Sequence, residues 1–377
     1  MSKNCVLTFL LVMSSINAVY TQPNVNKYQE ILNSATKNGL PAIVALIQSP
    51  NEKEWKGKSG VSNIENAIPL NINESFRLAS ITKIFTAITI LQLVDQKKIG
   101  LSDNISKYLD TDIKSKIPYV DEITILQLLS HSSGIYSFSE NNGFWKECFF
   151  EGGMSRIWKP DELISYIENK KPVSQPLEPY AEKLYSNTNY ILLGMIIEKI
   201  TSNPLSYEYQ KRIFTPLKMN GTFLEGYNIQ GRKAIDSYVV PNSYFLKSAV
   251  RRKDIKKVRG DKLINLSKEY KLFNSWAWAA GGVSSNINDL SSFFSAVRNQ
   301  ELLSDDTQKV LFQLNSDEEN GIIFFGGTGG SDGIQATMLH LMPHDLVIII
   351  LINSSGHKQV NLNSIFVELL KTASNKK

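Results

Sequence analysis

Ser80 and Lys83, three residues apart, are the side chains of this sequence best suited to covalent chemistry. A serine hydroxyl attacks poorly unless a base takes its proton, and a lysine can be that base when burial and a helix dipole lower its pKa. The residues after Ser80 have the spacing of one buried helical face, which predicts a helix starting there, with both side chains on its first turn. The alternative is that Ser80 is only an N-terminal cap. The apolar residues are Ile81, Ile84, Phe85, Ile88, Leu91 and Val94.

Two other segments carry groups that suit the same chemistry. Tyr185 and Asn187 lie where an extended segment meets a predicted helix, and a tyrosine beside an amine can carry a proton. The glycine-rich run 326–333 lies between two predicted strands, so a substrate could approach strand backbone there. The alternatives are a half-buried aromatic residue at Tyr185 and a flexible hairpin at the glycine run.

Two short motif matches are interpreted as coincidences. Residues 329–333 fit G-x-S-x-G, and Asp345 and His357 follow in the order of a hydrolase triad. That motif requires a helix directly after the serine, whereas a strand is predicted after Ser331. The sequence Ser-Asp-Asn at 102–104 lies beyond the far end of the Ser80 helix, roughly 25 Å away at 1.5 Å per residue.

Length and composition indicate a globular chain with one large domain or two intergrown ones. The chain has 377 residues, of which 42% are hydrophobic and 20% are charged. Residues 1–22 have the features of a secretory signal peptide, because Lys3 precedes an apolar run too short to span a membrane. Cleavage is expected between Ala18 and Gln22. A secreted or periplasmic location, with no transmembrane span, is therefore predicted.

The cysteines, the histidines and the distribution of charge show which kinds of stabilisation and which kinds of ligand site the sequence favours or disfavours. Cys148 would be the one cysteine left after cleavage, so stability must come from a hydrophobic core and not from an internal disulfide. The four histidines show no zinc-ligand spacing, and no metal or cofactor is expected. The net charge is +5, and Lys and Arg are concentrated in segment 247–262. That segment is either a solvated face or a contact with an anionic surface, and it lacks the aromatic residues of a nucleic-acid site.

The order of predicted elements places strands at both ends of the chain and helices between them. This order predicts an α/β (α+β) fold, in which an antiparallel sheet flanked by helices carries an inserted, mainly helical domain. The sheet domain is assigned to 23–98 and 283–377, and the insert to 99–282. Strands are predicted at 42–48, 54–61, 321–325, 334–341 and 346–352, and helices at 28–35, 80–96, 124–129, 160–169, 188–201, 207–214, 288–297 and 360–372.

Four stretches together resemble the serine β-lactamase and penicillin-recognising hydrolases, in particular their class C branch. This branch also holds D,D-carboxypeptidases, D-aminopeptidases and esterases. The resemblance spans roughly residues 30 to 370, and the order of the four stretches is more specific than any one of them. They are 76–85 around Ser80-x-x-Lys83, 128–135 (LLSHSSGI), 185–190 (YSNTNY) and 279–283 (AAGGV) with Asp289-Leu290.

The resemblance implies roles for individual residues. Ser80 would be the acylated nucleophile, Lys83 its base and Tyr185 the proton shuttle to the leaving group. The substrate would be bound by Asn187 and by Thr328, Gly329 and Gly330, with the backbone N–H groups of Ser80 and Gly330 as an oxyanion hole. The third family motif begins with Lys or His, and here Gly327 stands in that place.

These expectations favour an exported serine hydrolase that works through an acyl-enzyme. Because Gly327 cannot hold a substrate carboxylate, an esterase or peptidase for peptidoglycan-like or other small acyl substrates is preferred to an efficient β-lactamase. The alternatives are a β-lactamase or D,D-carboxypeptidase proper, and a catalytically weak penicillin-binding or sensor protein. If the G-x-S-x-G match were the active site instead, Ser331 and not Ser80 would be the nucleophile.

Overall fold

The computed structural model describes most of the chain. No helix among these residues is long and apolar enough to cross a membrane. The predicted signal peptide lies outside them, and so does the basic segment 247–262 except for a two-residue strand, β7 (Lys257–Val258). The described residues are 25–50, 52–227, 231–240, 257–258, 263–269, 272, 274–319, 322–357 and 360–374.

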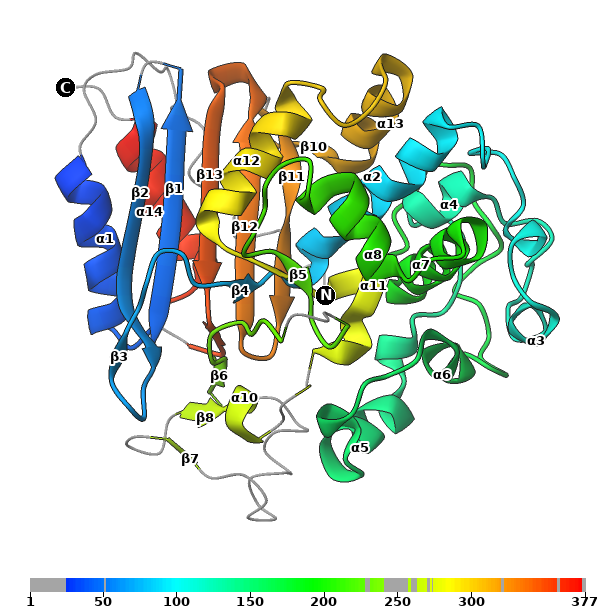
Figure 1. Ribbon diagram of the computed structural model, residues 1–377, viewed down its shortest axis with the longest axis horizontal. Helices are drawn as coiled ribbons and strands as arrows, with labels where there is room; N and C mark the ends of the chain where they lie inside the picture. The colour runs from blue at the N-terminus through cyan, green and yellow to red at the C-terminus, as the bar shows by residue number, and fades with distance from the viewer. Residues whose placement is uncertain are drawn as a thin grey trace.

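An antiparallel sheet of seven strands, formed by the two ends of the chain, is the centre of the fold (Figure 1). The first strand of the chain, β1, lies between β2 and β13, which is near the C-terminus. The prediction of a sheet shared by both ends is therefore confirmed. In spatial order the strands are β10 (Ser316–Glu319), β11 (Ile322–Ser331), β12 (Ile334–Leu341), β13 (Leu346–Ile352), β1 (Ala42–Ser49), β2 (Glu52–Asn63) and β3 (Ile68–Pro69).

Both faces of this sheet are buried, which explains why its central strands are apolar throughout. In β1, Ile43 and Ile47 face one hydrophobic cluster, while Val44 and Leu46 face the other. Such alternation follows from the two-residue period of a strand. Helices α1 (Val25–Lys37) and α14 (Leu362–Ser374) cover the first face, and α2 (Thr82–Asp95) and α12 (Ile287–Arg298) cover the second.

Most of the remaining helices lie together at one side of the sheet (Figure 1), while the helix at 305–315 packs on α2 and β11 and the helix at 266–269 lies apart, near the bottom of the view. They are mostly short, and the apolar α7 runs through the middle of this group against α2, α4 and α11. The helices are α3 (Thr111–Lys114), α4 (Ile125–Leu129), α5 (Asn142–Phe150), α6 (Pro160–Ser165), α7 (Asn187–Thr201), α8 (Leu205–Tyr209), α10 (Leu266–Glu269), α11 (Trp278–Gly281) and α13 (Asp305–Asn315).

Two small sheets join the middle of the chain to its ends. One has the order β4 (Phe76–Arg77), β9 (Val283–Ser285) and β5 (Phe223–Leu224). The other has the order β14 (Ser354–Ser355), β6 (Tyr238–Val239), β8 (Leu263–Asn265) and β7. Residues within 99–282 thus pair with strands outside that range, and the proposed domain boundaries stay a prediction.

The predicted fold class is confirmed, and the differences from prediction are local. Residues 142–150, where no helix was predicted, form α5. The strand predicted at 321–325 continues to Ser331, so most of the glycine run is strand and not hairpin. Pairing with β12 supplies the hydrogen bonds that hold these glycines extended, and no local sequence pattern reveals that pairing.

Candidate active site

Ser80 lies at the junction between a short strand and the helix α2. β4 leads through Leu78 into a 3₁₀ turn, η4 (Ala79–Ile81), which continues directly into α2. Ala79 has a φ of +46°, a left-handed conformation that costs energy for a residue with a Cβ atom. Leu78 N–H donates to the carbonyl of Val283 at 3.0 Å, so pairing with β9 fixes this entry.

A buried ion pair anchors the strand before the nucleophile. Arg77 donates to both carboxylate oxygens of Glu225, and also to Ile235 O and Ser237 Oγ. Both side chains of the ion pair are less than one-tenth exposed. Because a buried charge is costly without partners, these contacts favour one position for β4. They thereby define where the chain turns into Ser80.

The Ser80 hydroxyl contacts two ionisable side chains. Its Oγ lies 2.7 Å from the Tyr185 hydroxyl and 3.3 Å from Lys83 Nζ. The simple capping alternative is wrong, because neither η4 nor α2 has a side-chain cap and their N-cap residues are Leu78 and Ile81. The structure therefore brings together the three side chains that the sequence proposed as catalytic.

Lys83 is buried, with 6% of its surface exposed. Desolvation lowers the pKa of its amine from the ordinary value of 10.5, because burial disfavours the charged form. Nζ also donates to Ala280 O at 2.7 Å and to Asn187 Oδ1 at 2.9 Å. A neutral amine has two N–H donors and one lone pair. The contact with Ser80 Oγ at 3.3 Å uses the third position on the nitrogen, which is an N–H in the charged amine and the lone pair in the neutral one.

Tyr185 is held by a ring that the sequence analysis did not select as a site residue. His131 stacks on it, with ring centroids 4.5 Å apart, and His131 Nδ1 accepts a hydrogen bond from Ser186 N–H at 3.2 Å. Burial, together with the charge of Lys83, holds the pKa of His131 well below its ordinary value. His131 is therefore neutral near pH 7. In the sequence, His131 belongs to the stretch 128–135 that resembles the family, and this match could have marked it as a residue of the site.

Asn187 is positioned at the start of α7 by two serines about fifty residues earlier in the chain, at the 3₁₀ turn η6 (Phe138–Glu140). Its backbone N–H donates to Ser137 Oγ at 3.0 Å, and its Nδ2 donates to Ser139 Oγ at 2.9 Å. With Nδ2 held by Ser139, the amide oxygen faces Lys83. Nothing in the spacing of Ser137 and Ser139 distinguishes them from ordinary loop serines, so sequence reasoning missed both.

Strand β11 lies directly against the nucleophile turn. A Cβ atom on Gly329 would stand 2.0 Å from Leu78 O and 3.1 Å from Ser80 N, so only glycine fits. Thr328 and Gly330 flank it and pair with Thr337 and Gln335 of β12. A Cβ atom on Gly327, in contrast, would meet no heavy atom within 4 Å. The substrate-binding roles of Thr328, Gly329 and Gly330 stay predictions.

Neither of the two coincidental motif matches, G-x-S-x-G at 329–333 and Ser-Asp-Asn at 102–104, forms a site in the structure. Asp345 contacts His340 and Arg298, while His357 Nε2 lies 3.1 Å from Ser354 Oγ. Ser331 ends β11, and the strand β12 follows it, as expected. The Asp103 carboxylate accepts hydrogen bonds from Lys107, Tyr108 and Gly100 N beyond the C-terminal end of α2.

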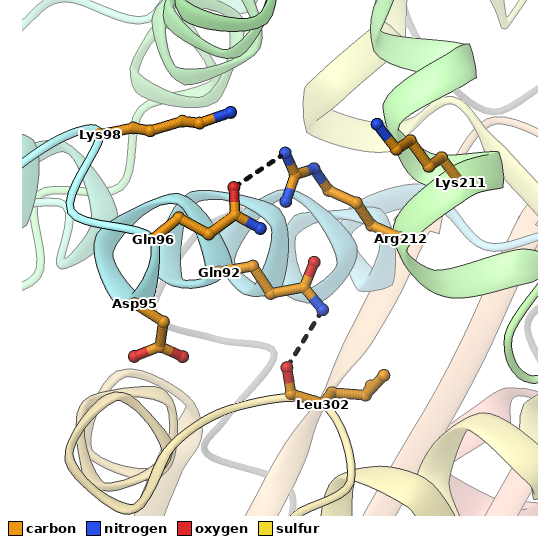
Figure 2. Close-up of a pocket in the computed structure, with 7 residues that line it drawn as sticks. All are labelled: Gln92, Asp95, Gln96, Lys98, Lys211, Arg212 and Leu302. Carbon is orange, nitrogen blue, oxygen red and sulfur yellow. Dashed lines mark hydrogen bonds between the residues drawn. The ribbon is translucent and has the colours of Figure 1, made fainter.

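A cavity of about 480 Å³ lies at the opposite end of α2 from Ser80 (Figure 2). Its Arg212 is held by Glu208 and points to Gln96, and Gln92 donates to Leu302 O. Gln96 is sixteen residues after Ser80 in the chain, about 24 Å along a helix. This cavity is therefore separate from the Ser80 constellation.

Comparison with known proteins agrees with this geometry. The family model described as beta-lactamase matches residues 26–367, and the chain belongs to that family of serine hydrolases. Penicillin-binding protein 4* of Bacillus subtilis (strain 168) is 26% identical over 311 residues, which are 78% of this chain and 64% of the relative. Teichoic acid D-alanine hydrolase of Staphylococcus aureus is 28% identical over 213 residues, 55% of this chain and 47% of the relative.

A solved structure shares the whole fold. The D-stereospecific amidohydrolase from Streptomyces sp. superposes with a TM-score of 0.71 at 25% identity, covering 93% of this chain and 98% of that one. The family expectation from the sequence is confirmed. The chain spans 64% and 47% of the lengths of the two relatives named above.

Proposed function

We propose that this protein is a serine hydrolase that cleaves an ester or amide through an acyl-enzyme on Ser80. The observation that carries the proposal is the contact of Ser80 Oγ with both Tyr185 and the buried Lys83. A nucleophile, a base of lowered pKa and a second proton carrier within reach of one another are what acyl transfer requires.

In the proposed mechanism, Ser80 Oγ attacks the carbonyl carbon while its proton passes to the Lys83 amine. The tetrahedral oxyanion is stabilised by the N–H groups of Ser80 and Gly330. This assignment is supported by the close approach of Gly329 to Ser80 N. Tyr185 delivers a proton to the leaving group as the carbon–heteroatom bond breaks. Water then attacks the acyl-enzyme, and the same groups return Ser80 to its starting state.

An esterase, amidase or peptidase is favoured over an efficient β-lactamase or D,D-carboxypeptidase. Gly327 offers no cation to a substrate carboxylate, and its open surroundings hold no other side chain within 4 Å of its Cβ position. The names of two relatives, D-stereospecific amidohydrolase and teichoic acid D-alanine hydrolase, agree with this preference. Small or peptidoglycan-related acyl compounds are the proposed substrates.

Export is part of the same proposal. Residues 1–22 have the composition of a signal peptide, and a secreted or periplasmic hydrolase of the class C type would act on cell-envelope substrates. The basic segment 247–262 would assist by attraction to an anionic surface. N-terminal sequencing of the mature protein tests this, and a mature chain starting between Ala18 and Gln22 is expected.

Active-site labelling tests the catalytic proposal. An alkyl fluorophosphonate should modify Ser80 once, as read by intact mass and peptide mapping, and Ser80→Ala should lose both labelling and hydrolysis of aryl esters. Ser292→Ala, on the exposed face of α12, is the matched control and should behave as the wild type. A label on Ser331 would replace the proposed nucleophile. Absence of any label would favour a binding or sensor protein.

A further inference from the structure

The cavity at the C-terminal end of α2 has the size of a small-molecule site. Its volume of about 480 Å³ falls within the range of roughly 300–1,000 Å³ that is typical of ligand pockets. Gln92 and Gln96, one helical turn apart on the same face of α2, form one wall, and Leu302 forms another. Gln92 Nε2 donates to Leu302 O at 3.1 Å, so these walls are fixed to each other although the two residues are 210 positions apart in the sequence.

Three basic side chains, Lys98, Lys211 and Arg212, line this cavity. Their charged ends lie on the same side of α2 (Figure 2). Lys98 N–H donates to Leu93 O at 3.0 Å and closes a Schellman turn, which fixes the backbone that carries Lys98. Lys211 and Arg212 belong to a π-helical turn, η8 (Gln210–Phe214), a rare conformation that often occurs at functional sites. The three cations are thus brought together by two different elements.

Arg212 is held rigidly and faces the cavity. Its side chain is 8% exposed, and its Nε donates to the carboxylate of Glu208, which is 1% exposed. Glu208 also accepts a hydrogen bond from Asn203 Nδ2 at 2.9 Å. Arg212 Nη2 reaches Gln96 Oε1 at 3.4 Å, which is long for a hydrogen bond. Because a charged oxygen bonds a guanidinium more strongly than an amide oxygen does, an anionic ligand could replace this contact.

Asp95, the one carboxylate among the residues that line the cavity, is directed elsewhere. It accepts hydrogen bonds from Ser304 N–H at 3.0 Å and from Thr307 Oγ1 at 2.9 Å, so it stabilises the start of α13. In Figure 2 it points to the opposite side of α2 from the three basic side chains. The charge of Asp95 therefore does not cancel theirs inside the cavity.

The ordinary role of basic residues at a helix end explains only part of this arrangement. Lys98, close after the last turn of α2, complements the negative end of the helix dipole. Lys211 and Arg212 come from η8, and their charges are not needed for that purpose. Arg212 is neutralised by Glu208, whereas Lys98 and Lys211 are exposed and make the cavity positive.

We propose that this cavity binds the phosphate group of a small phosphate ester. The fork of an arginine and the point charges of two lysines are well suited to phosphate oxygens, and the volume leaves room for the organic part of the ester. The cavity lies about 24 Å along α2 from Ser80, so this inference does not depend on the proposed hydrolase. A soluble ester and a lipid headgroup offer the same phosphate chemistry, and the experiment distinguishes these two sources.

Isothermal titration calorimetry with glycerol phosphate, at constant ionic strength, tests the proposal. The wild type should bind glycerol phosphate more tightly than acetate, which carries a single charge, and added salt should weaken binding. The double variant Lys98→Gln/Lys211→Gln should weaken binding at least 10-fold, because it removes two charged donors. Both lysines are exposed, so the variant should fold, as thermal unfolding checks. Arg212 is kept because it pairs with the buried Glu208.

A variant with the same change of charge provides the control. Lys37→Gln/Lys309→Gln alters exposed positions on α1 and α13 outside the cavity and should bind as the wild type does. Sedimentation with phosphatidylglycerol vesicles, lost in the cavity variant alone, would identify a lipid headgroup as the source of the phosphate. Equal affinities in the cavity and control variants would overturn the proposal, and so would a lack of binding to both glycerol phosphate and vesicles.

Discussion

The imidazole of His131 lies flat against the phenol ring of Tyr185, with ring centroids 4.5 Å apart and an angle of 30° between the planes. Tyr185 is 41% exposed and belongs to a segment without regular structure, so its own surroundings constrain it weakly. His131 is buried and bonded to the backbone of Ser186. The buried His131 therefore orients the exposed Tyr185 toward Ser80, although His131 does not itself contact Ser80.

We predict that His131→Ala lowers kcat by about 10- to 100-fold and changes KM much less, because Tyr185 would no longer be oriented. His131→Phe keeps the stacking but not the Nδ1 acceptor, and should retain more activity than His131→Ala. Steady-state kinetics on a neutral aryl ester provides the measurement. Equal activity in the wild type and His131→Ala would remove the positioning role.

The buried amine of Lys83 predicts a particular pH dependence. Because its pKa is lowered from 10.5, the rising limb of kcat/KM with pH should lie below the usual range of lysine. Lys83→Arg keeps a positive charge but cannot lose its proton, and we expect at least a 1,000-fold loss of kcat.

The same group affects stability. In the folded state Lys83 binds its proton less tightly than in the unfolded state, so the unfolded state takes up more protons between the two pKa values. The free energy of unfolding contributed by Lys83 therefore rises with pH across that window and is lost as pH falls through the folded pKa. Denaturant unfolding of the wild type and Lys83→Met at several pH values measures this difference, and parallel curves would contradict it.

Gly327 and Gly329 provide a matched pair of substitutions on one strand. A Cβ atom at 329 would overlap the Leu78 carbonyl, whereas a Cβ atom at 327 would enter open space. Gly329→Ala should therefore destabilise the fold by about 1–3 kcal/mol and abolish acylation of Ser80, since β11 must move away. Gly327→Ala should be close to the wild type in both. Thermal unfolding and fluorophosphonate labelling of the two variants make the comparison.

The open space at Gly327 also allows the missing cation to be restored. Gly327→His or Gly327→Lys should raise kcat/KM for penicillins and D-Ala-D-Ala peptides by roughly 10- to 100-fold, because a charge-assisted hydrogen bond contributes about 1.5–3 kcal/mol. Neutral aryl esters should change much less. Efficient cleavage of carboxylate substrates by the wild type, or an equal gain for both substrate types, would contradict the argument.

The sequence by itself determined the local part of this site. The three-residue spacing of Ser80 and Lys83 puts both on one helical turn whatever the rest of the chain does, because helix geometry is local. The apolar runs of β1 and β13 likewise predicted buried strands from the two chain ends. Tyr185 and Asn187 were candidates from their place before a predicted helix, and resemblance to the family then linked them to Ser80, which no spacing could do across a hundred residues of chain.

Only the tertiary structure decided what surrounds Lys83 and Tyr185. The Ala280 carbonyl, the His131 ring and the serines that hold Asn187 come from segments far apart in sequence. The extension of β11 through its glycines depends on pairing with β12, and its approach to Leu78 depends on how that sheet packs on η4. These contacts arise from packing between distant segments, which periodicity, propensity and motif spacing do not encode.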